Sequence, residues 1–273
     1  MYNSRIIHLS DLHFEDINED KRVHVFESDA EEAKRNVQIE QHKKIRDLLV
    51  ESVKKLTDEL KFHKTYVVLT GDLAYHGTRK EYAMVKKFLT DLKRQIHYKD
   101  AFFCPGNHDL RRPTYLRDFF ELQYIGIRTE DSAAVETVEN MVRNEHERRF
   151  LMKSMQEYYK FADKETKKAP RNRKTELYRV YRILEGNLKV NVISLNSSFL
   201  YHKQLPYYGY LTEDQVHRAF GTVHEGKTGD SKEFNIILLH HPLEAQLSAK
   251  RAEITECFNE NAHLILAGHD HFF

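Results

Sequence analysis

Five short motifs rich in Asp, His and Asn are spread along the chain. They are Asp11-Leu12-His13, Gly71-Asp72, Gly106-Asn107-His108-Asp109, His240-His241-Pro242 and Gly268-His269-Asp270-His271. Imidazole nitrogens together with carboxylate and amide oxygens are ligands of divalent transition metals. A carboxylate can also bridge two cations, because each of its oxygens can bind one of them. The five motifs together are therefore sufficient for a centre of two metal ions.

Each motif alone has a simpler explanation. An Asp after a strand usually forms a turn or caps a helix, and a solvated pair explains two neighbouring His residues equally well. Asp11 and His13 would point to the same side if the extended backbone continues past the first strand. The metal interpretation depends on the conjunction, since five independent turns would not each need residues that bind metals.

The segments before the motifs are short apolar runs typical of buried strands. They cover residues 5–10, 65–70, 101–104, 235–239 and 263–267, and helical patterns alternate with them. This alternation predicts an α/β fold. Open α/β sheets collect their ligands beyond the carboxyl ends of the strands, so we expect the five motifs to meet at one edge.

Apolar spacing predicts a long helix between the first two strands. Its apolar residues should form one face against the core, and they are Val37, Ile45, Leu48, Leu49, Val53, Leu56 and Leu60. Two further helices should begin at capping boxes, in which a Thr and a Glu or Gln three residues later bond each other's backbone. These are Thr78 with Glu81 and Thr212 with Gln215.

Residues 177–184 and 188–195 predict a β-hairpin, because both runs are β-rich and a Gly lies in the connection. Residues 113–175 instead indicate a highly charged helical insertion between core strands. From Arg143 to Arg182 there are thirteen Lys or Arg and six Asp or Glu, an excess of seven positive charges. A solvated surface is the plain explanation, and a basic cap that selects a polyanionic substrate is the functional one.

The composition favours one catalytic domain over residues 1–273 of a cytoplasmic protein. The formal charge is only +1, so the chain as a whole has no general attraction for nucleic acid or membranes. Cys104 and Cys257 do not form a paired-cysteine spacing, which argues against a disulfide scaffold and a Cys zinc site. We expect no membrane-spanning segment, because no apolar stretch is long enough.

The motifs resemble those of the calcineurin-like metallophosphoesterase superfamily, and the resemblance runs from Ile6 to the C-terminus. It implies a layered αββα sandwich that hydrolyses phosphate esters with two divalent metal ions, Mn, Fe or Zn. One metal would be held by Asp11, His13, Asp72 and His271. The other would be held by Asp72, Asn107, His240 and His269, with Asp72 as the bridge. Members of the superfamily usually continue with strands that complete the second sheet, so we expect the chain to be the N-terminal part of a longer protein.

His108 resembles the proton donor of this superfamily, which protonates the leaving oxygen. A pair of metal ions about 3.5–4 Å apart neutralises the charge of the ester and activates water, and a general acid completes the reaction. Asp109 could orient His108 as a second catalytic residue, and a purely structural role in the turn is equally open. The superfamily carries its ligand on the first His of a pair such as His240-His241, so we expect His241 to be a neighbour of the metals.

The motifs also bear on the substrate class. Ser/Thr protein phosphatases of the superfamily continue the second motif with Asp-Arg-Gly and carry Glu after the Asn-His pair, whereas this chain has Leu73 and Asp109. Gly77 with Glu81-Tyr82 looks more like the branch of cyclic-nucleotide phosphodiesterases, and the branch of DNA-repair nucleases is also similar. We expect phosphodiesters of nucleotides or nucleic acid. The alternatives are a phosphomonoesterase and a non-catalytic metal-binding scaffold or sensor domain.

Residues 221–228 match the phosphate-binding-loop pattern letter for letter. Such a loop must join a strand to a helix whose N-terminus faces the phosphates. Here a predicted helix precedes the pattern, and only a short polar stretch separates it from the next strand. We therefore expect a surface loop.

Overall fold

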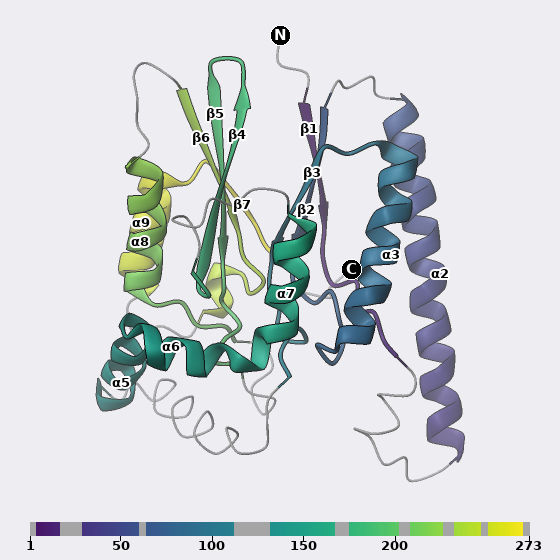
Figure 1. Cartoon of the computed structure of the whole chain (residues 1–273), viewed down its shortest axis with the longest axis horizontal. Helices are drawn as coiled ribbons and strands as arrows, with labels where there is room; N and C mark the ends of the chain where they lie inside the picture. Colours follow the sequence, from purple (N-terminus) through teal and green to yellow (C-terminus); the bar gives the residue numbers. More distant parts are fainter. Residues whose placement is uncertain are drawn as a thin grey trace.

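Two β-sheets face each other, and helices cover their outer sides (Figure 1). The computed structural model describes residues 4–16, 29–59, 64–111, 132–166, 175–201, 208–225, 232–246 and 251–269. Its layers, helices on sheet on sheet on helices, are those of the αββα sandwich predicted from the sequence. Within the described residues, no helix is long and apolar enough to cross a membrane.

The first sheet has the order β1-β2-β3 and is parallel throughout. Its strands cover Ser4–Leu9 (β1), Lys64–Thr70 (β2) and Asp100–Cys104 (β3). Leu9 pairs with Leu69, and Thr70 pairs with Cys104, so the three strands end almost in step. The loops that follow them therefore leave the sheet side by side.

The second sheet has the order β4-β5-β6-β7. Its strands cover Tyr178–Glu185 (β4), Leu188–Leu195 (β5), Lys232–Leu238 (β6) and Leu264–Leu266 (β7). Strands β4 and β5 form an antiparallel pair, which confirms the predicted hairpin. Gly186 has a φ of 58° in the connection, a conformation that glycine adopts without steric cost. The pairs β5-β6 and β6-β7 are parallel, so these three strands run toward the same edge.

Helices lie on the outer side of each sheet (Figure 1). Helices α2 (Asp29–Glu59) and α3 (Arg79–Ile96) cover the first sheet, and α8 (Glu213–His224) and α9 (Arg251–Asn261) cover the second. Both predicted capping boxes are present, at Thr78 with Glu81 and at Thr212 with Gln215. The last turn of α8 contains Gly221 to His224, which contradicts a phosphate-binding loop there, because that loop must follow a strand.

The predicted apolar face of α2 is only partly right. Val53 is buried and Leu49 is half-buried, but Val37, Ile45, Leu48 and Leu56 are exposed. The helix instead packs through Ile39, Arg46 and Val53, a face that the apolar count alone did not single out. Only one side of the helix can contact the sheet and α3, so the second group of apolar residues points outward. Leu60 lies outside the described residues.

The insertion between the two sheets is helical, as predicted, over the part that is described. Its elements are α5 (Ser132–Arg143), α6 (Glu145–Leu151), the 3₁₀ helix η2 (Met152–Met155) and α7 (Gln156–Glu165). Tyr158 and Phe161 of α7 join the core of the first sheet, whereas Val138 and Leu151 form a separate core with Phe199. Residues 113–131 and 167–174 of the predicted insertion lie outside the described residues.

We predict that Leu89→Ala lowers the free energy of unfolding by about 2–5 kcal/mol, because Leu89 is 1% exposed in the core of the first sheet. The matched control on the same helix is Met84→Ala, since Met84 is 37% exposed. Its cost should stay within about 0.5–1 kcal/mol. Urea unfolding followed by circular dichroism measures both, and equal costs would contradict the packing of α3.

Candidate metal centre

Five loops at the carboxyl ends of five strands bring the predicted ligands together. The first sheet contributes Asp11 after β1, Asp72 after β2 and Asn107 after β3, and the second sheet contributes His240 after β6 and His269 after β7. The candidate site therefore lies where the edges of both sheets meet. His271 lies outside the described residues, so its place in the site stays a prediction.

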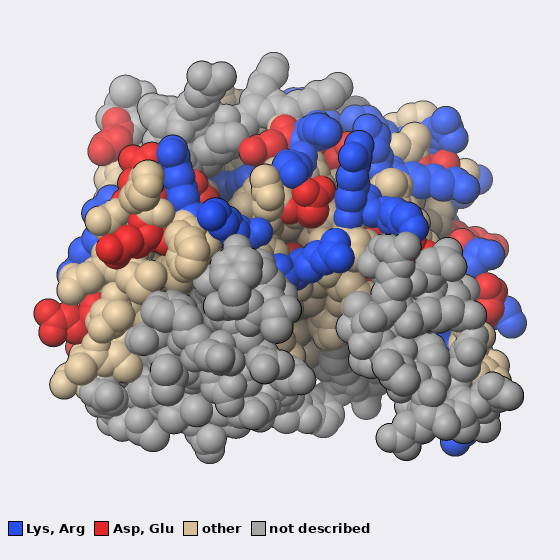
Figure 2. Space-filling model, turned by 60° about the horizontal axis from the view of Figure 1, so that its bottom comes forward, with Lys and Arg blue, Asp and Glu red and all other residues tan. Residues whose placement is uncertain are grey.

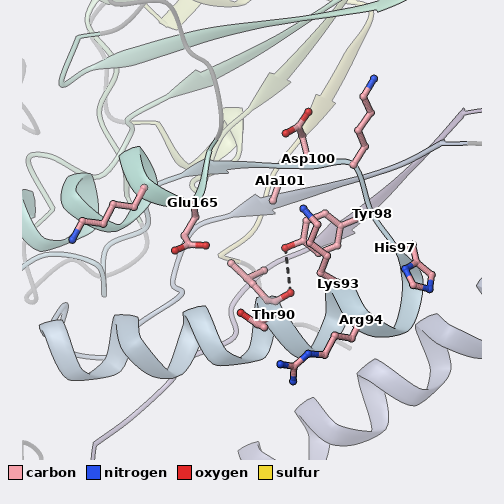
Figure 3. A pocket seen from close by; sticks show the side chains of 11 residues that line it. Thr90, Lys93, Arg94, His97, Tyr98, Asp100, Ala101 and Glu165 are labelled. Carbon is pink, nitrogen blue, oxygen red and sulfur yellow. Dashed lines mark hydrogen bonds between the residues drawn. The ribbon is translucent and has the colours of Figure 1, made fainter.

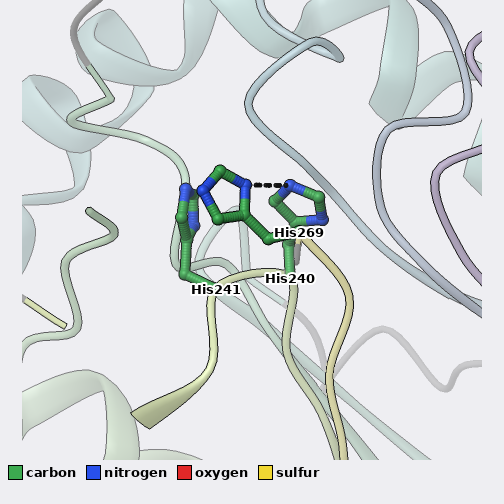
Figure 4. A group of neighbouring side chains, drawn as sticks. All are labelled: His240, His241 and His269. Carbon is green, nitrogen blue, oxygen red and sulfur yellow. Dashed lines mark hydrogen bonds between the residues drawn. The ribbon is translucent and has the colours of Figure 1, made fainter. Parts of the chain in front are cut away.

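The ring nitrogen Nε2 of His240 is the meeting point of one group of donors. It lies 3.3 Å from Asp72 Oδ2, 2.9 Å from Asn107 Oδ1 and 3.1 Å from His269 Nδ1. Figure 4 shows His240 and His269 turned toward each other. The other nitrogen of His240, Nδ1, donates to Thr70 O at 2.8 Å, which directs Nε2 toward the group.

A second group of donors shares the same aspartate. His13 Nε2 lies 3.9 Å from Asp11 Oδ1 and 3.8 Å from Asp72 Oδ2. Asp72 thus belongs to both groups through one oxygen, Oδ2, while its Oδ1 accepts from the backbone N–H of His108. Each group offers imidazole nitrogen and carboxylate oxygen without thiolate, a donor set that fits Mn, Fe or Zn.

Four of these residues have a left-handed backbone that non-glycine residues rarely adopt. The φ angles are 56° at Asp11, 44° at His13, 52° at Asp72 and 74° at His269. The extended backbone expected from Asp11 to His13 is therefore wrong. Hydrogen bonds hold the turn instead, from Asp11 N to Gly71 O at 3.2 Å and from His13 N to Asp72 O at 2.9 Å. Such strain is typical of functional sites, where the surrounding structure fixes it.

Two glycines allow the loops to approach each other. A Cβ on Gly106 would lie 2.1 Å from Asp72 Oδ1, and a Cβ on Gly71 would lie 2.6 Å from His240 Nδ1. Both distances are far shorter than two non-bonded atoms tolerate. The glycines are thus required by the close approach of the Asp72 and His240 side chains to neighbouring backbone.

The buried carboxylate of Asp72 and the imidazole of His240 stabilise each other. Burial alone would raise the pKa of Asp72, but the imidazoles of His240, His108 and His13 hold it well below its usual range. Burial likewise opposes a charge on His240, yet Asp72 raises the pKa of His240 to about 9. Asp72 and His240 therefore form a buried, strongly polar pair, in which a cation would replace the proton as the partner of Asp72.

His108 lies beside both groups. Its backbone N–H donates to Asp72 Oδ1 at 2.8 Å, and its ring centre is 4.8 Å from that of His13. Its Nδ1 lies 3.0 Å from Tyr75 O. A carbonyl oxygen only accepts, so Nδ1 carries the hydrogen of this bond and Nε2 is the nitrogen left to exchange a proton.

Asp109 contacts the backbone of two loops rather than the imidazole of His108. Its carboxylate accepts from Gly106 N at 2.9 Å, Ala74 N at 3.1 Å and Tyr82 Oη at 2.9 Å. Burial, followed by the charge of Asp72, raises the pKa of Asp109 to about 6. The sequence left open whether Asp109 orients His108 or has a structural role in the turn. These contacts are those of the structural role.

His241 lies near the candidate ligands, as expected, and two further residues nearby, Arg35 and Ser197, were not predicted. His241 is fully buried, its ring centre is 4.4 Å from that of His269, and its Nδ1 is 3.1 Å from Ser197 Oγ. Arg35 of α2 lies over the ring of Tyr75 at 4.5 Å. Ser197 follows the end of β5 closely, so the rule that located the five motifs would also have found it.

A separate pocket of about 450 Å³ lies between the end of α3 and the start of β3 (Figure 3). Lys93, His97 and Tyr98 are among the residues that line it. The pocket contains Asp100, which begins β3, whereas the candidate ligands follow Cys104 at the other end of the strand. It is therefore distinct from the candidate metal centre.

The sequence profile of the calcineurin-like phosphoesterases matches residues 4–273. The chain belongs to this family. Its members hydrolyse phosphoesters with metal ions, typically two, which agrees with the two donor groups that share Asp72. A search of curated proteins gives no match to the chain. The family fixes the reaction class of this phosphoesterase and leaves its substrate and its metals open.

We predict that Gly106→Ala weakens metal binding by about 10–100-fold, because the new methyl group displaces the Asp72 carboxylate. Gly221→Ala is the matched control, since a Cβ there meets nothing within 4 Å. That substitution should leave metal binding unchanged and stabilise α8 by about 0.5–1 kcal/mol. Metal content after dialysis, measured by mass spectrometry alongside thermal unfolding, compares the two. Equal metal retention would argue against the close approach of the two loops.

Proposed function

We propose that this phosphoesterase hydrolyses phosphodiesters of nucleotides or nucleic acid with two divalent cations, Mn, Fe or Zn. The observation that carries the proposal is the convergence of donor atoms from both sheets on Asp72 and His240, with His108 beside them. Bound cations would neutralise the charge of the ester and activate water for attack. The residues of the chain then have to hold the ions, place the ester and supply a proton.

We assign the ligands in two sets. Asp11, His13, Asp72 and His271 would hold one ion. Asp72, Asn107, His240 and His269 would hold the other. The geometry supports the shared place of Asp72, because its Oδ2 faces both His13 and His240. The hydrogen bond from His240 Nδ1 to Thr70 O supports the ligand role of its Nε2.

His108 is the proposed general acid. Its Nδ1 hydrogen is held by Tyr75 O, so a proton on Nε2 is available to the leaving oxygen. An alkoxide is a poor leaving group, and diester cleavage therefore depends on such a donor. Asp109 serves this step indirectly, because it ties the loop of Gly106 to that of Ala74.

A pocket on the helical insertion supports a polyanionic substrate. It has a volume of about 630 Å³, and its charged lining residues are Arg149, Lys153, Lys160, Arg179, Asp163 and Glu176. Arg179 is 5% exposed and pairs with Asp163 at 3.1 Å. Lys153 and Lys160 are exposed and can reach phosphate groups. On the face shown in Figure 2, Lys and Arg gather beside acidic side chains, so any preference must come from local groups of this kind.

The insertion pocket is connected to the candidate metal centre through hydrogen bonds. Tyr159, which lines the pocket, accepts from Asn196 Nδ2 at 2.9 Å. Asn196 Oδ1 accepts from Ser198 N at 2.9 Å, and Ser198 Oγ donates to Pro105 O at 3.3 Å. Pro105 directly precedes Gly106. We propose that a long substrate bound at the metals extends toward this surface.

The resemblance to cyclic-nucleotide phosphodiesterases depends on residues with structural roles. Glu81 accepts from Thr78 N at 2.9 Å in the capping box, and Tyr82 donates to Asp109. Neither contact reaches the candidate metal centre directly. We therefore propose that the insertion selects the substrate class. Cyclic nucleotides remain one kind of diester to be tested.

We predict that the protein cleaves aryl phosphodiesters in the presence of Mn²⁺ and that thorough chelation abolishes the activity. A screen of mono- and diesters, cyclic nucleotides and oligonucleotides, repeated with Fe and Zn²⁺, measures this. Undiminished turnover after chelation would contradict the two-metal assignment. Activity confined to monoesters would favour the phosphomonoesterase alternative, and metal binding without any turnover would favour a scaffold or sensor.

We predict different defects for two neighbouring substitutions. Asp72→Asn should weaken the loading of both ions, because it impairs the shared carboxylate. His108→Ala should retain both ions and slow the cleavage of esters with poor leaving groups by about 10²–10⁴-fold. Metal stoichiometry together with rates on good and poor leaving groups separates the two. A His108→Ala enzyme at full rate on a poor leaving group would reject the acid role.

We predict that Lys153→Gln with Lys160→Gln slows oligonucleotide cleavage and spares a small aryl diester. Loss of two cations should lower the slope of affinity against salt concentration, on logarithmic axes, by about 1–2. Lys54→Gln with Lys87→Gln is the matched control, since both residues are exposed on the helices outside the first sheet. Equal effects of the two pairs on oligonucleotides would reject the insertion as a substrate surface.

A further inference from the structure

Helix α2 carries apolar side chains on two different faces. One face packs on the core of the first sheet through Val53, with Leu49 and Val50 beside it. The other face is uncovered: Val37, Ile45, Leu48 and Leu56 are exposed by 57%, 61%, 62% and 56%. Single apolar residues are normal on a surface, whereas several large ones gathered on one side of a helix mark an interaction surface.

The exposed residues form one straight row with the polar residues between them. The row consists of Lys34, Val37, Gln41, Ile45, Leu48, Ser52, Leu56 and Glu59, and all eight are exposed. They follow one another at steps of 3, 4, 4, 3, 4, 4 and 3 residues. This spacing repeats every 11 residues, or about 3.67 per turn, which is close to the period of an α-helix. The row therefore runs nearly parallel to the helix axis.

The chemical character of the row is symmetric about its middle, which lies between Arg46 and Asp47. Reversal of the row places an apolar residue opposite an apolar one, a polar residue opposite a polar one and a cation opposite an anion. The resulting pairs are Ile45 with Leu48, Val37 with Leu56, Gln41 with Ser52 and Lys34 with Glu59. A second copy of the helix, laid antiparallel on the first, would match it at every position.

We propose that the α2 row is the interface of an antiparallel dimer of this chain. A two-fold axis at the middle of the row makes the contact self-complementary, as closed dimers require. Ile45 and Leu48 of both copies form its centre, and the two Lys34–Glu59 pairs close its ends. In a parallel arrangement, Lys34 would instead face Lys34 of the other copy, and Glu59 would face Glu59.

The charges beside the row favour a protein partner over a lipid surface. Helices that lie on anionic membranes carry mainly Lys and Arg on their polar face. Here the exposed acids Glu40, Asp47, Glu51 and Asp58 are matched by the exposed bases Lys43, Lys44, Lys54 and Lys55. The polar face of α2 is therefore balanced in charge and lacks the basic excess of a helix that lies on anionic lipid.

The size of the row predicts weak association. From Lys34 to Glu59 the helix is about 37 Å long, and a helix face about 10 Å wide then contributes roughly 400 Å² per partner. Stable complexes bury about 800 Å² per partner, so we expect a dissociation constant in the micromolar range. Arg46, on the opposite side of α2, donates to Leu12 O at 3.0 Å. Pairing through the row therefore leaves the ligand loops on the far side of the helix.

Sedimentation velocity over micromolar to near-millimolar protein tests the proposal. The unaltered chain should convert from monomer to dimer within this range, and Ile45→Glu with Leu48→Glu should remain monomeric throughout. Both side chains are exposed, so thermal unfolding of dilute protein should not change. A chain that stays monomeric throughout, or a dimer that survives this double substitution, would overturn the proposal.

A charge exchange tests the antiparallel direction. Lys34→Glu and Glu59→Lys should each weaken the dimer by about tenfold, because each turns two attractive contacts into repulsive ones. The two substitutions together should restore the original affinity. A parallel dimer would not be weakened by either single change, and that result would overturn the direction. Binding of the monomer to anionic vesicles through the row would assign it to lipid and reject the dimer.

Discussion

The buried contact between Asp72 and His240 is the interaction on which the rest of the site depends. It joins the two sheets, because Asp72 follows β2 and His240 follows β6, and both side chains are almost fully enclosed. An ionised carboxylate costs several kcal/mol to bury unless other groups compensate it. The backbone N–H of His108 and the imidazoles around Asp72 provide that compensation. The buried charge of Asp72 therefore requires that these groups surround it where the two sheets meet.

The fold meets this requirement through the register of its strands. Parallel strands that end in step release their loops at the same edge, and the two facing sheets bring two such edges together. The loops must then turn sharply, which explains the left-handed backbone at Asp11, His13 and Asp72. Gly106 leaves room for the Asp72 carboxylate. The strained backbone and the glycines are thus both consequences of the close approach of the ligand loops to each other.

Two further surfaces lie outside the candidate metal centre. The helical insertion adds a basic pocket connected to the ligand loop of Gly106 through Tyr159, Asn196 and Ser198. Helix α2 contributes Arg35 next to Tyr75 on its inner side and an apolar row on its outer side. The proposed substrate selection and self-association would therefore depend on surfaces separate from the candidate ligands.

The sequence by itself determined the five core strands, both capping boxes, the hairpin and the set of candidate ligands. These depend on local apolar patterns, and Asp, His or Asn directly after a strand is visible in a list of letters. Which face of α2 packs was not visible, because Val53 and Leu48 are equally apolar and only the neighbouring sheet distinguishes them. The partners of Asp109 were not visible either, since its hydrogen bonds to Ala74 and Tyr82 cross more than twenty residues of chain. Contacts between distant segments depend on how the layers stack, and only the tertiary structure decides that.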